Sequence, residues 1–285
     1  MNALFKYEGM PSDHAASLER PQVIAIHGSA STGGQWRRLV GELSSTYDVV
    51  RPDLPGYGRQ QTVVPHGLPT LDGDAIEIER IAKMSSAPSH VVAHSYGAAV
   101  AIKFALNHPQ LVASLTLIEP VLFHLLRSGE ADDLAHYTEI SAIANAVRMG
   151  AQFGMPAQGM ASFVDYWNGL GTWAAMKPSL QAALAVQATQ VARNFAATFQ
   201  ETWSASACHN IQCPTLIIAA EDSRGPAKRV AEIVAAAVPQ AQLKTIADAG
   251  HMAPVTHPEI INPLIAEALA VANPGRIEAS HCEAA

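Results

Sequence analysis

The sequence has few charged residues for its length. Asp, Glu, Lys and Arg make up 15% of its 285 residues, and the 25 acidic residues outnumber the 18 basic ones, which gives a formal net charge of -7. An average domain has about a quarter charged residues. Without a surplus of basic residues, the composition gives no indication of a basic patch that would bind a phosphate backbone, so it argues against a nucleic-acid partner. A small, neutral or apolar substrate fits it better.

Cysteine is scarce as well. The three cysteines, Cys208, Cys213 and Cys282, form no C-x-x-C pair, and an odd number cannot all pair within one chain. We therefore expect free thiols in a reducing compartment, which predicts a cytoplasmic protein.

Long apolar runs are absent. The N-terminal stretch has no continuous apolar segment of signal-peptide length, and no uninterrupted run reaches the roughly 20 residues that a membrane-spanning helix needs. The sequence thus predicts no membrane insertion. Its hydrophobic content is nevertheless 49%, which at this length is enough for a large core and excludes intrinsic disorder for most of the chain.

Short apolar segments bounded by turn residues recur along the chain. They are predicted strands at 23–26, 47–53, 90–95, 114–119, 214–220 and 242–247. Nearly continuous apolar character is typical of strands buried on both faces of a parallel sheet. Segments with helical spacing lie between them, at 34–43, 72–84, 96–107, 226–238 and 259–271. The alternation predicts an α/β fold with a mostly parallel central sheet flanked by helices and joined by right-handed crossovers.

One long segment breaks the alternation. Residues 124–202 carry helical patterns with Gly and Pro punctuation and no convincing strand. Because this segment lies between two predicted strands, we expect an inserted, all-helical cap over one end of the sheet. The core would then consist of 1–123 and 203–272, and 273–285 would form a loose tail.

Aromatic residues gather inside the predicted cap. They are Phe163, Tyr166, Trp167 and Trp173, with Met176 nearby. Aromatic side chains dominate cores in general, so they are interpreted first as the small core of the insertion itself. Contact with a substrate is the alternative interpretation.

A serine stands between a buried strand and an Ala-rich helix, in the segment AHSYGAA. Ser95 has a small residue two positions before it, Ala93, and another two positions after it, Gly97. A tight strand-to-helix turn needs small flanking residues and leaves the serine hydroxyl projecting above the sheet. The segment therefore predicts a nucleophile elbow, in which Ala93 replaces the more common Gly.

The first predicted strand ends in the Gly-rich segment HGSASTGG. Such a turn can offer a backbone N–H to a developing oxyanion, with the amide after the nucleophile as the second donor. This assigns the oxyanion hole to the backbone N–H groups of Ser29 and Tyr96. A dinucleotide site would need G-x-G-x-x-G and a later ribose-binding acid, which the segment lacks. For the ring of His27 we favour a structural hydrogen-bonding role.

A histidine follows the last predicted strand, in the segment DAGHM. A neutral imidazole at the carboxyl end of the sheet can accept the hydroxyl proton of Ser95, so His251 is the candidate general base. Metal binding is the rival interpretation, but His251 and His257 do not form a helical i, i+4 pair and have no H-E-x-x-H context. No metal site is expected.

Taken in order, the segments HGSAS, RPDLPGYG, AHSYGAA, the helical insertion, PTLIIAAEDS and DAGHMAPVTHP resemble those of α/β-hydrolase fold serine hydrolases with a helical cap. The resemblance covers nearly the whole chain. It implies that Ser95 is the nucleophile and His251 the base. In RPDLPGYG it matches the family's D-x-x-G-x-G turn at Asp53, Gly56 and Gly58, which would shape a loop near the site.

The sequence departs from that family at the triad acid. The acid usually follows the strand after the cap, but there the matching position holds Ser223, with Asp222 one residue early. Some members place a carboxylate after the strand before the cap, which here is Glu119. Either group could orient the imidazole. We favour Glu119 over Asp222, with Asp248 as a third choice; otherwise Glu119 is a solvated strand end and Asp222 a helix cap.

A serine nucleophile excludes the aspartate-nucleophile chemistry of dehalogenases and epoxide hydrolases. The leading prediction is hydrolysis of a carboxylic ester with a small, largely apolar acyl or aryl group. A C–C bond, a lactone or a thioester would suit the same residues, and a non-catalytic ligand-binding protein is the alternative from another class.

Substrate choice would come from the cap and from Phe123, His124, Trp167 and Trp173. We expect a small-molecule substrate and no cofactor. The sparsely charged, Ala-rich surface is compatible with a homodimer.

Overall fold

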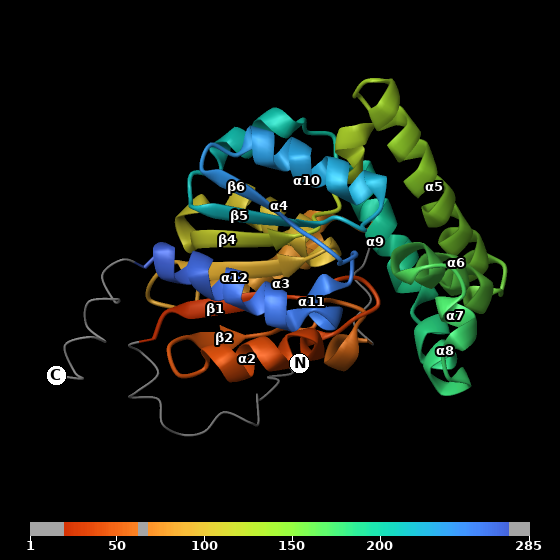
Figure 1. Cartoon of the computed structure of the whole chain (residues 1–285), viewed down its shortest axis with the longest axis horizontal. Helices are drawn as coiled ribbons and strands as arrows, with labels where there is room; N and C mark the ends of the chain where they lie inside the picture. The colour runs from red at the N-terminus through yellow and green to blue at the C-terminus, as the bar shows by residue number, and fades with distance from the viewer. Residues whose placement is uncertain (1–19, 62–67, 274–285) are drawn as a thin grey trace, which may run out of the picture.

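The computed structural model describes residues 20–61 and 68–273, and its centre is a six-stranded sheet (Figure 1). The strands are β1 (Gln22–Ile26), β2 (Asp48–Val50), β3 (Ser89–His94), β4 (Val112–Ile118), β5 (Thr215–Ala220) and β6 (Ala241–Ile246). Their order is β2-β1-β3-β4-β5-β6, and all neighbours run parallel. The α/β fold expected from the sequence is confirmed.

Helices cover both faces of this sheet. They are α2 (Arg37–Leu43), α3 (Leu71–Ala82), α4 (Tyr96–Asn107), α10 (Gly225–Ala237), α11 (Ala253–Thr256) and α12 (Pro258–Val271). Short 3-10 turns are η1 (Gly33–Trp36), η2 (Gly58–Gln60), η3 (Pro109–Leu111), η4 (Phe123–Leu126) and η5 (Ala205–Asn210). Each helix predicted around the sheet is present, although the first begins as a 3-10 turn, η1, and continues as α2.

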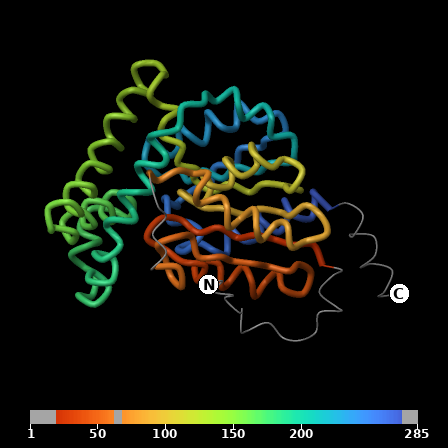
Figure 2. Tube along the Cα trace, turned by 180° about the vertical axis from the view of Figure 1, so that it is seen from behind, coloured from red at the N-terminus to blue at the C-terminus, as the bar shows by residue number. Residues whose placement is uncertain are grey.

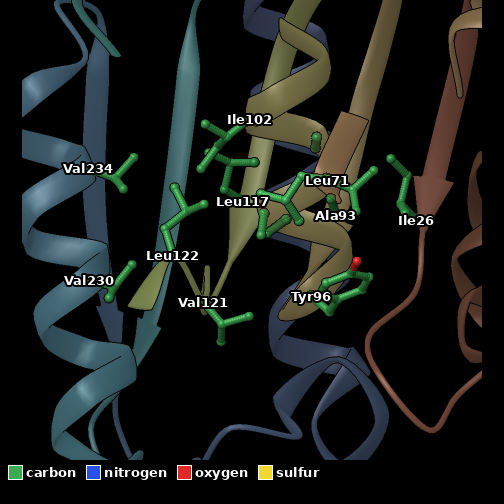
Figure 3. Close-up of a cluster of buried hydrophobic side chains, with 14 of the residues drawn as sticks. Ile26, Leu71, Ala93, Tyr96, Ile102, Leu117, Val121, Leu122, Val230 and Val234 are labelled. Atoms are coloured by element: carbon green, nitrogen blue, oxygen red, sulfur yellow. The ribbon is translucent and has the colours of Figure 1, made fainter. Parts of the chain in front are cut away.

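Strand alternation divides the core into two halves. Ile24 and Ile26 of β1 face the side covered by α3, α4 and α10, whereas Val23 and Ala25 face the side covered by α2 and α12. All four side chains are buried, as expected for an interior strand of a parallel sheet. Figure 3 shows the first half, to which Ile26, Ala93 and Leu117 of the sheet, Ile102 of α4 and Val230 of α10 contribute, with Ile26 and Val230 at opposite sides of the cluster.

The start of α3 shows how local sequence sets an element. The Thr70 hydroxyl accepts the Gly73 N–H, and Asp72 and Asp74 lie in the first turn, where carboxylates favour a helix N-terminus. Leu71, Ala75, Ile78 and Ala82 recur at helical spacing and are buried. The Thr70 N-cap fixes where this helix begins, and the row of buried apolar residues fixes which face it turns to the sheet.

The expectation that every strand is buried on both faces is wrong at the edges. β6 is mostly exposed or half-buried, and β2 is half-buried along its three residues. Both are edge strands, so each has one open side and incomplete helix cover. Lys244 of β6 lies at this edge and pairs with Glu267 of α12 at 3.0 Å.

Between β4 and β5 the chain is helical. This helical insertion comprises α5 (Ala131–Gln152), α6 (Pro156–Asn168), α7 (Thr172–Ala175), α8 (Pro178–Ala185) and α9 (Ala188–Gln200). It lies beside one end of the sheet in two opposite views (Figures 1 and 2). Across 20–61 and 68–273 no helix is both long and apolar enough to cross a membrane. The predicted tail at 273–285 and Cys282 lie, apart from Asn273, outside the described residues.

Candidate active site

Ser95 occupies a sharp turn between β3 and α4. Its backbone has φ 55° and ψ -118°, a left-handed conformation that a residue with a side chain adopts only under strain. The turn is held by the Ser95 N–H, which donates to the Ile118 carbonyl at 2.9 Å. At Gly97, an added Cβ would lie 2.5 Å from the carbonyl oxygen of His27 and 2.7 Å from that of Ile26. Glycine is therefore required two residues after the serine.

His251 bonds to both Ser95 and Glu119. Its Nε2 lies 2.9 Å from the Ser95 Oγ, and its Nδ1 lies 3.0 Å from the Glu119 Oε2. A carboxylate only accepts, so Nδ1 carries the proton and Nε2 is free to accept the serine hydroxyl proton. The three side chains are 8%, 3% and 0% exposed for Ser95, His251 and Glu119. The structure thus joins three predicted residues in one buried hydrogen-bonded chain.

Glu119 follows β4 and is held by two further donors. The Ala220 N–H donates to its Oε1 at 2.7 Å, and the Ser223 hydroxyl donates to its Oε2. Its backbone is also in the left-handed region, with φ 51°. Two donors plus the His251 Nδ1–H stabilise the carboxylate in place. Glu119 is fully buried, so the alternative interpretation of this residue as a solvated strand end is wrong.

The two rival acids lie outside this chain of hydrogen bonds. Asp222 is exposed, and its backbone N–H donates to the Ala249 carbonyl at 2.9 Å. Asp248 is exposed as well, in a turn with φ 52°. The position that the family pattern gives to the acid is Ser223, and this residue instead donates to Glu119. The geometry therefore favours Glu119 and excludes Asp222 from contact with His251.

The loop after β1 is organised by His27. Leu54 N–H donates to the His27 Nε2 at 2.9 Å, and the His27 Nδ1–H donates to the Gly28 carbonyl at 2.7 Å. Burial lowers the pKa of His27 to about 4, so the ring is neutral near pH 7 and can fill both roles. The structural role favoured for His27 is confirmed.

Asp53 ties the same loop to the D-x-x-G-x-G turn. Its Oδ1 accepts the Gly33 N–H at 2.8 Å, and its Oδ2 accepts the Arg59 N–H at 2.9 Å. Gly56 and Gly58 have φ of 84° and 50°, which glycine adopts readily. The aspartate thereby fixes the two loops that lie on either side of it.

A small pocket opens in front of Ser95. Its lining combines five apolar residues with five polar or amphipathic ones: Val121, Phe123, Phe163, Trp167, Phe195, Ser29, Ser95, Tyr96, Asn194 and Thr198. Ser29 and Tyr96, the predicted oxyanion donors, thus border the same space as the serine. Tyr96 is the first residue of α4, where backbone N–H groups lack intrahelical partners.

The predicted substrate-contacting residues divide into two pairs. Phe123 and Trp167 line the pocket, and Phe163 lines it too, so two members of the aromatic cluster of the insertion, Phe163 and Trp167, face the site. His124 and Trp173 do not line it. The His124 ring packs edge-on against Trp203 at 4.5 Å. Trp173 is tied to the insertion by its backbone N–H, which donates to the Asp165 Oδ1 at 2.7 Å. The expectation for His124 and Trp173 is corrected accordingly.

Asn194 is a site residue that the sequence did not reveal. It comes from α9 of the insertion, and its Nδ2 donates to the Ser29 Oγ at 2.8 Å and to the Tyr57 hydroxyl at 2.7 Å. Its Oδ1 accepts from Gln190 at 3.0 Å. One asparagine in an amphipathic helix has no local signal of such a role, because the contact joins segments far apart in the chain.

Two buried groups beside the site have shifted pKa values. Burial is the main cause that raises the pKa of Asp74 to about 6, while the hydrogen bond from the Tyr96 hydroxyl at 2.6 Å and the charge of Arg193 oppose it. Burial also lowers the pKa of His94 to about 3, helped by the neighbouring His251. His94 is therefore neutral, and its Nε2–H donates to the His251 carbonyl at 2.8 Å.

Comparison with known proteins gives a consistent family. A family model described as "Alpha/beta hydrolase family" matches residues 23–264. A Klebsiella pneumoniae protein named "Putative carbamate hydrolase RutD" is 27% identical over 267 residues, covering 89% of this chain and 93% of that protein. A pimeloyl-[acyl-carrier protein] methyl ester esterase of Methylococcus capsulatus is 38% identical over 99 residues, covering 34% of this chain and 36% of the esterase.

A solved structure shares the fold. A thermophilic esterase from Thermogutta terrifontis superposes with a TM-score of 0.68 at 22% identity, covering 88% of this chain and 90% of the esterase.

Proposed function

Because the chain belongs to the alpha/beta hydrolase family and is therefore a hydrolase, we propose that it cleaves a carboxylic ester through an acyl-enzyme on Ser95. The observation that carries this proposal is the chain of hydrogen bonds from Ser95 through His251 to Glu119, at 2.9 and 3.0 Å. It starts at a strained turn whose serine borders a pocket.

The first half-reaction forms the acyl-enzyme. The Ser95 Oγ attacks the ester carbonyl carbon while the His251 Nε2 takes its proton, and the carbonyl oxygen becomes an oxyanion. Glu119, in contact with Nδ1, stabilises the imidazolium that results. When the tetrahedral intermediate collapses, the C–O bond to the leaving alcohol breaks and Nε2 returns the proton to that alcohol.

The oxyanion is assigned to the backbone N–H groups of Ser29 and Tyr96. Donors at the position where negative charge develops lower the barrier more than donors to the ground-state carbonyl. Both residues line the pocket in front of Ser95, which supports the assignment. In the second half-reaction, water loses a proton to His251, attacks the acyl carbon and releases the acid and Ser95.

The proposed substrate has a small, largely apolar acyl or aryl group. Phe123, Phe163 and Phe195 give the pocket an apolar wall, which suits a short acyl chain or a single ring. Residues of the helical insertion line this pocket, which supports the interpretation of the insertion as a cap.

Carbamate hydrolysis is a second candidate. The relative from Klebsiella pneumoniae with this name aligns over most of both chains. A carbamate carbonyl can be attacked by the same serine and stabilised by the same donors, because it also passes through a tetrahedral oxyanion. Substrate turnover distinguishes the two candidates.

The test is turnover of p-nitrophenyl acetate, butyrate and octanoate beside p-nitrophenyl N-methylcarbamate. We expect a serine- and histidine-dependent kcat/KM that is highest for the short esters, and no activity above background in Ser95→Ala. Preferred turnover of the carbamate would select the second candidate. A wild-type protein that turns over none of the four substrates, or a Ser95→Ala variant as active as wild type, would exclude the proposed mechanism.

A further inference from the structure

A tryptophan of the helical insertion lies flat against the candidate general base. The Trp167 and His251 rings have their centroids 3.8 Å apart and their planes 25° apart. Both side chains are buried, at 8% and 3% exposure. Trp167 comes from α6, whereas His251 lies after β6, so the contact joins the insertion to the core at the reacting residue itself.

The two hydrogen bonds of His251 act on Nδ1 and Nε2, in the plane of the ring. They oppose a small tilt of the ring about its Cβ–Cγ bond less than a contact with the ring face does. His94 holds the backbone of this residue through the bond from its Nε2–H to the His251 carbonyl at 2.8 Å, and its ring lies 5.1 Å from the His251 ring at a tilt of 44°. The face-to-face contact with Trp167, at 3.8 Å and 25°, is the closer and flatter of these two ring contacts and opposes the tilt most directly.

The indole is itself held in place from the core. Arg224 Nε donates to the Tyr166 carbonyl at 2.7 Å, and the guanidinium lies 5.1 Å from the centre of the Tyr166 ring. Tyr166 in turn packs edge-on against Trp167 at 4.7 Å. Arg224 follows Ser223, the residue that donates to Glu119. One loop after β5 therefore positions both the acid and the tryptophan that flank His251.

An aromatic face is also suited to the charge that His251 acquires. The imidazole becomes a cation when it takes the serine proton, and the face of tryptophan attracts a cation more strongly than that of tyrosine or phenylalanine. The contact thus becomes more favourable as the reaction proceeds, which is the condition for lowering a barrier.

We propose that Trp167 is a positioning residue for the general base, so that the helical insertion supplies part of the acyl-transfer machinery as well as the pocket wall. This inference rests on the proposed function. It assigns to Trp167 an effect on kcat, distinct from the effect on KM expected of a side chain that only lines the pocket.

The experiment compares Trp167→Leu, Trp167→Met and Trp167→Phe with Trp173→Leu, which removes a tryptophan of the same insertion that does not line the pocket. The substrates are p-nitrophenyl acetate and butyrate. We expect kcat to fall about tenfold for both esters in the Leu and Met variants, since small misplacements of catalytic groups cost up to about a hundredfold. Phe should restore most of the loss, and Trp173→Leu should match wild type.

Several results would overturn the inference. One is a kcat within twofold of wild type in the Leu or Met variant, with only KM changed. Another is a loss in Trp167→Phe as large as in Trp167→Met, because a stacked aromatic face would then not matter. Met is unbranched and adapts to an irregular space, so the Met variant gives the result if the Leu variant does not fold. An inactive wild type would overturn the proposed function as well, whereas active wild type with unaffected variants overturns this inference alone.

Discussion

The Glu119 carboxylate accepts three hydrogen bonds at the site. Ala220 N–H and the Ser223 hydroxyl hold it, and the His251 Nδ1–H uses it as an acceptor. With three donors on a fully buried group, a substitution that keeps its shape but changes its hydrogen bonding should affect the imidazole directly.

The Glu119→Gln variant should lower kcat by about three to four orders of magnitude, because an amide NH₂ facing Nδ1 favours the wrong imidazole tautomer. Asp222→Asn is the matched control, since Asp222 is exposed and directly precedes Ser223, which donates to Glu119. It should keep kcat within about twofold of wild type. Steady-state kinetics with p-nitrophenyl acetate measure both. Equal losses in the two variants would contradict the assignment of the acid.

Asp74 makes a separate prediction for stability. Its pKa in the folded protein, about 6, lies above the ordinary value of 3.8, so the folded state binds the proton more tightly than the unfolded state. Its contribution to stability is therefore full below about pH 4, is lost as the pH rises through about 6, and stays lost above it. Asp74→Asn keeps an oxygen that can accept from Tyr96 but does not titrate.

The free energy of unfolding of Asp74→Asn, taken relative to wild type, should accordingly rise by about 2 kcal/mol between pH 4 and pH 8. Urea unfolding at a series of pH values measures this difference. A difference that does not change with pH would show that Asp74 titrates alike in the folded and unfolded states.

At the scale of elements, the strand–turn–helix unit of β3, Ser95 and α4 is the most strongly specified part of the site. Its small residues are explained by contacts: Gly97 faces the carbonyl oxygens of Ile26, at the end of β1, and of His27, and Ala93 is fully buried. A short sequence sufficed to predict this unit because both small residues lie within two positions of the serine, although the contact of Gly97 with the end of β1 is between segments far apart in the chain. The six strands and the helices between them could also be predicted from the sequence, because the periodicity of their apolar residues indicates the type of element directly.

Gly97→Ala should lower the free energy of unfolding by about 1–3 kcal/mol, because its Cβ would meet backbone atoms that cannot move aside easily. It should also lower kcat by displacing Ser95. Gly41→Ala in α2 is the matched control, since a Cβ there meets nothing within 4 Å and alanine favours helix. It should be neutral or up to about 1 kcal/mol more stable. Thermal and urea unfolding measure both; a Gly97→Ala variant as stable as wild type would contradict the close approach.

For the whole molecule, the important relation is between the helical insertion and the core. Arg229 of α10 pairs with Asp133 of α5 at 2.6 Å, and Asn194 of α9 bonds to Ser29 and Tyr57. These contacts lie between residues far apart in the chain. Patterns of single segments do not predict which side chains meet across such distances, and for this reason Asn194 and the Trp167–His251 stack went unpredicted, and His124 and Trp173 were assigned to the wrong surroundings.

Asn194→Ala should destabilise the protein by about 1–3 kcal/mol, because it removes the buried amide that donates to both the Ser29 and the Tyr57 hydroxyls. It should also raise KM, since Asn194 lines the pocket. Asn168→Ala is the control within the insertion, because the Asn168 amide donates only to Val164 of its own helix and the residue is exposed. Urea unfolding and ester kinetics test the pair. Equal effects of the two substitutions would argue against a specific link through Asn194.

The central claim is that His251 activates Ser95 as a nucleophile. Its most direct test is the rate and site of labelling by a fluorophosphonate, read by intact mass and peptide mapping. The account predicts one adduct per chain on the peptide that contains Ser95, no adduct in Ser95→Ala, and labelling slowed by at least about a hundredfold in His251→Gln. An adduct on another residue, no uptake by wild type, or undiminished labelling in His251→Gln would contradict it.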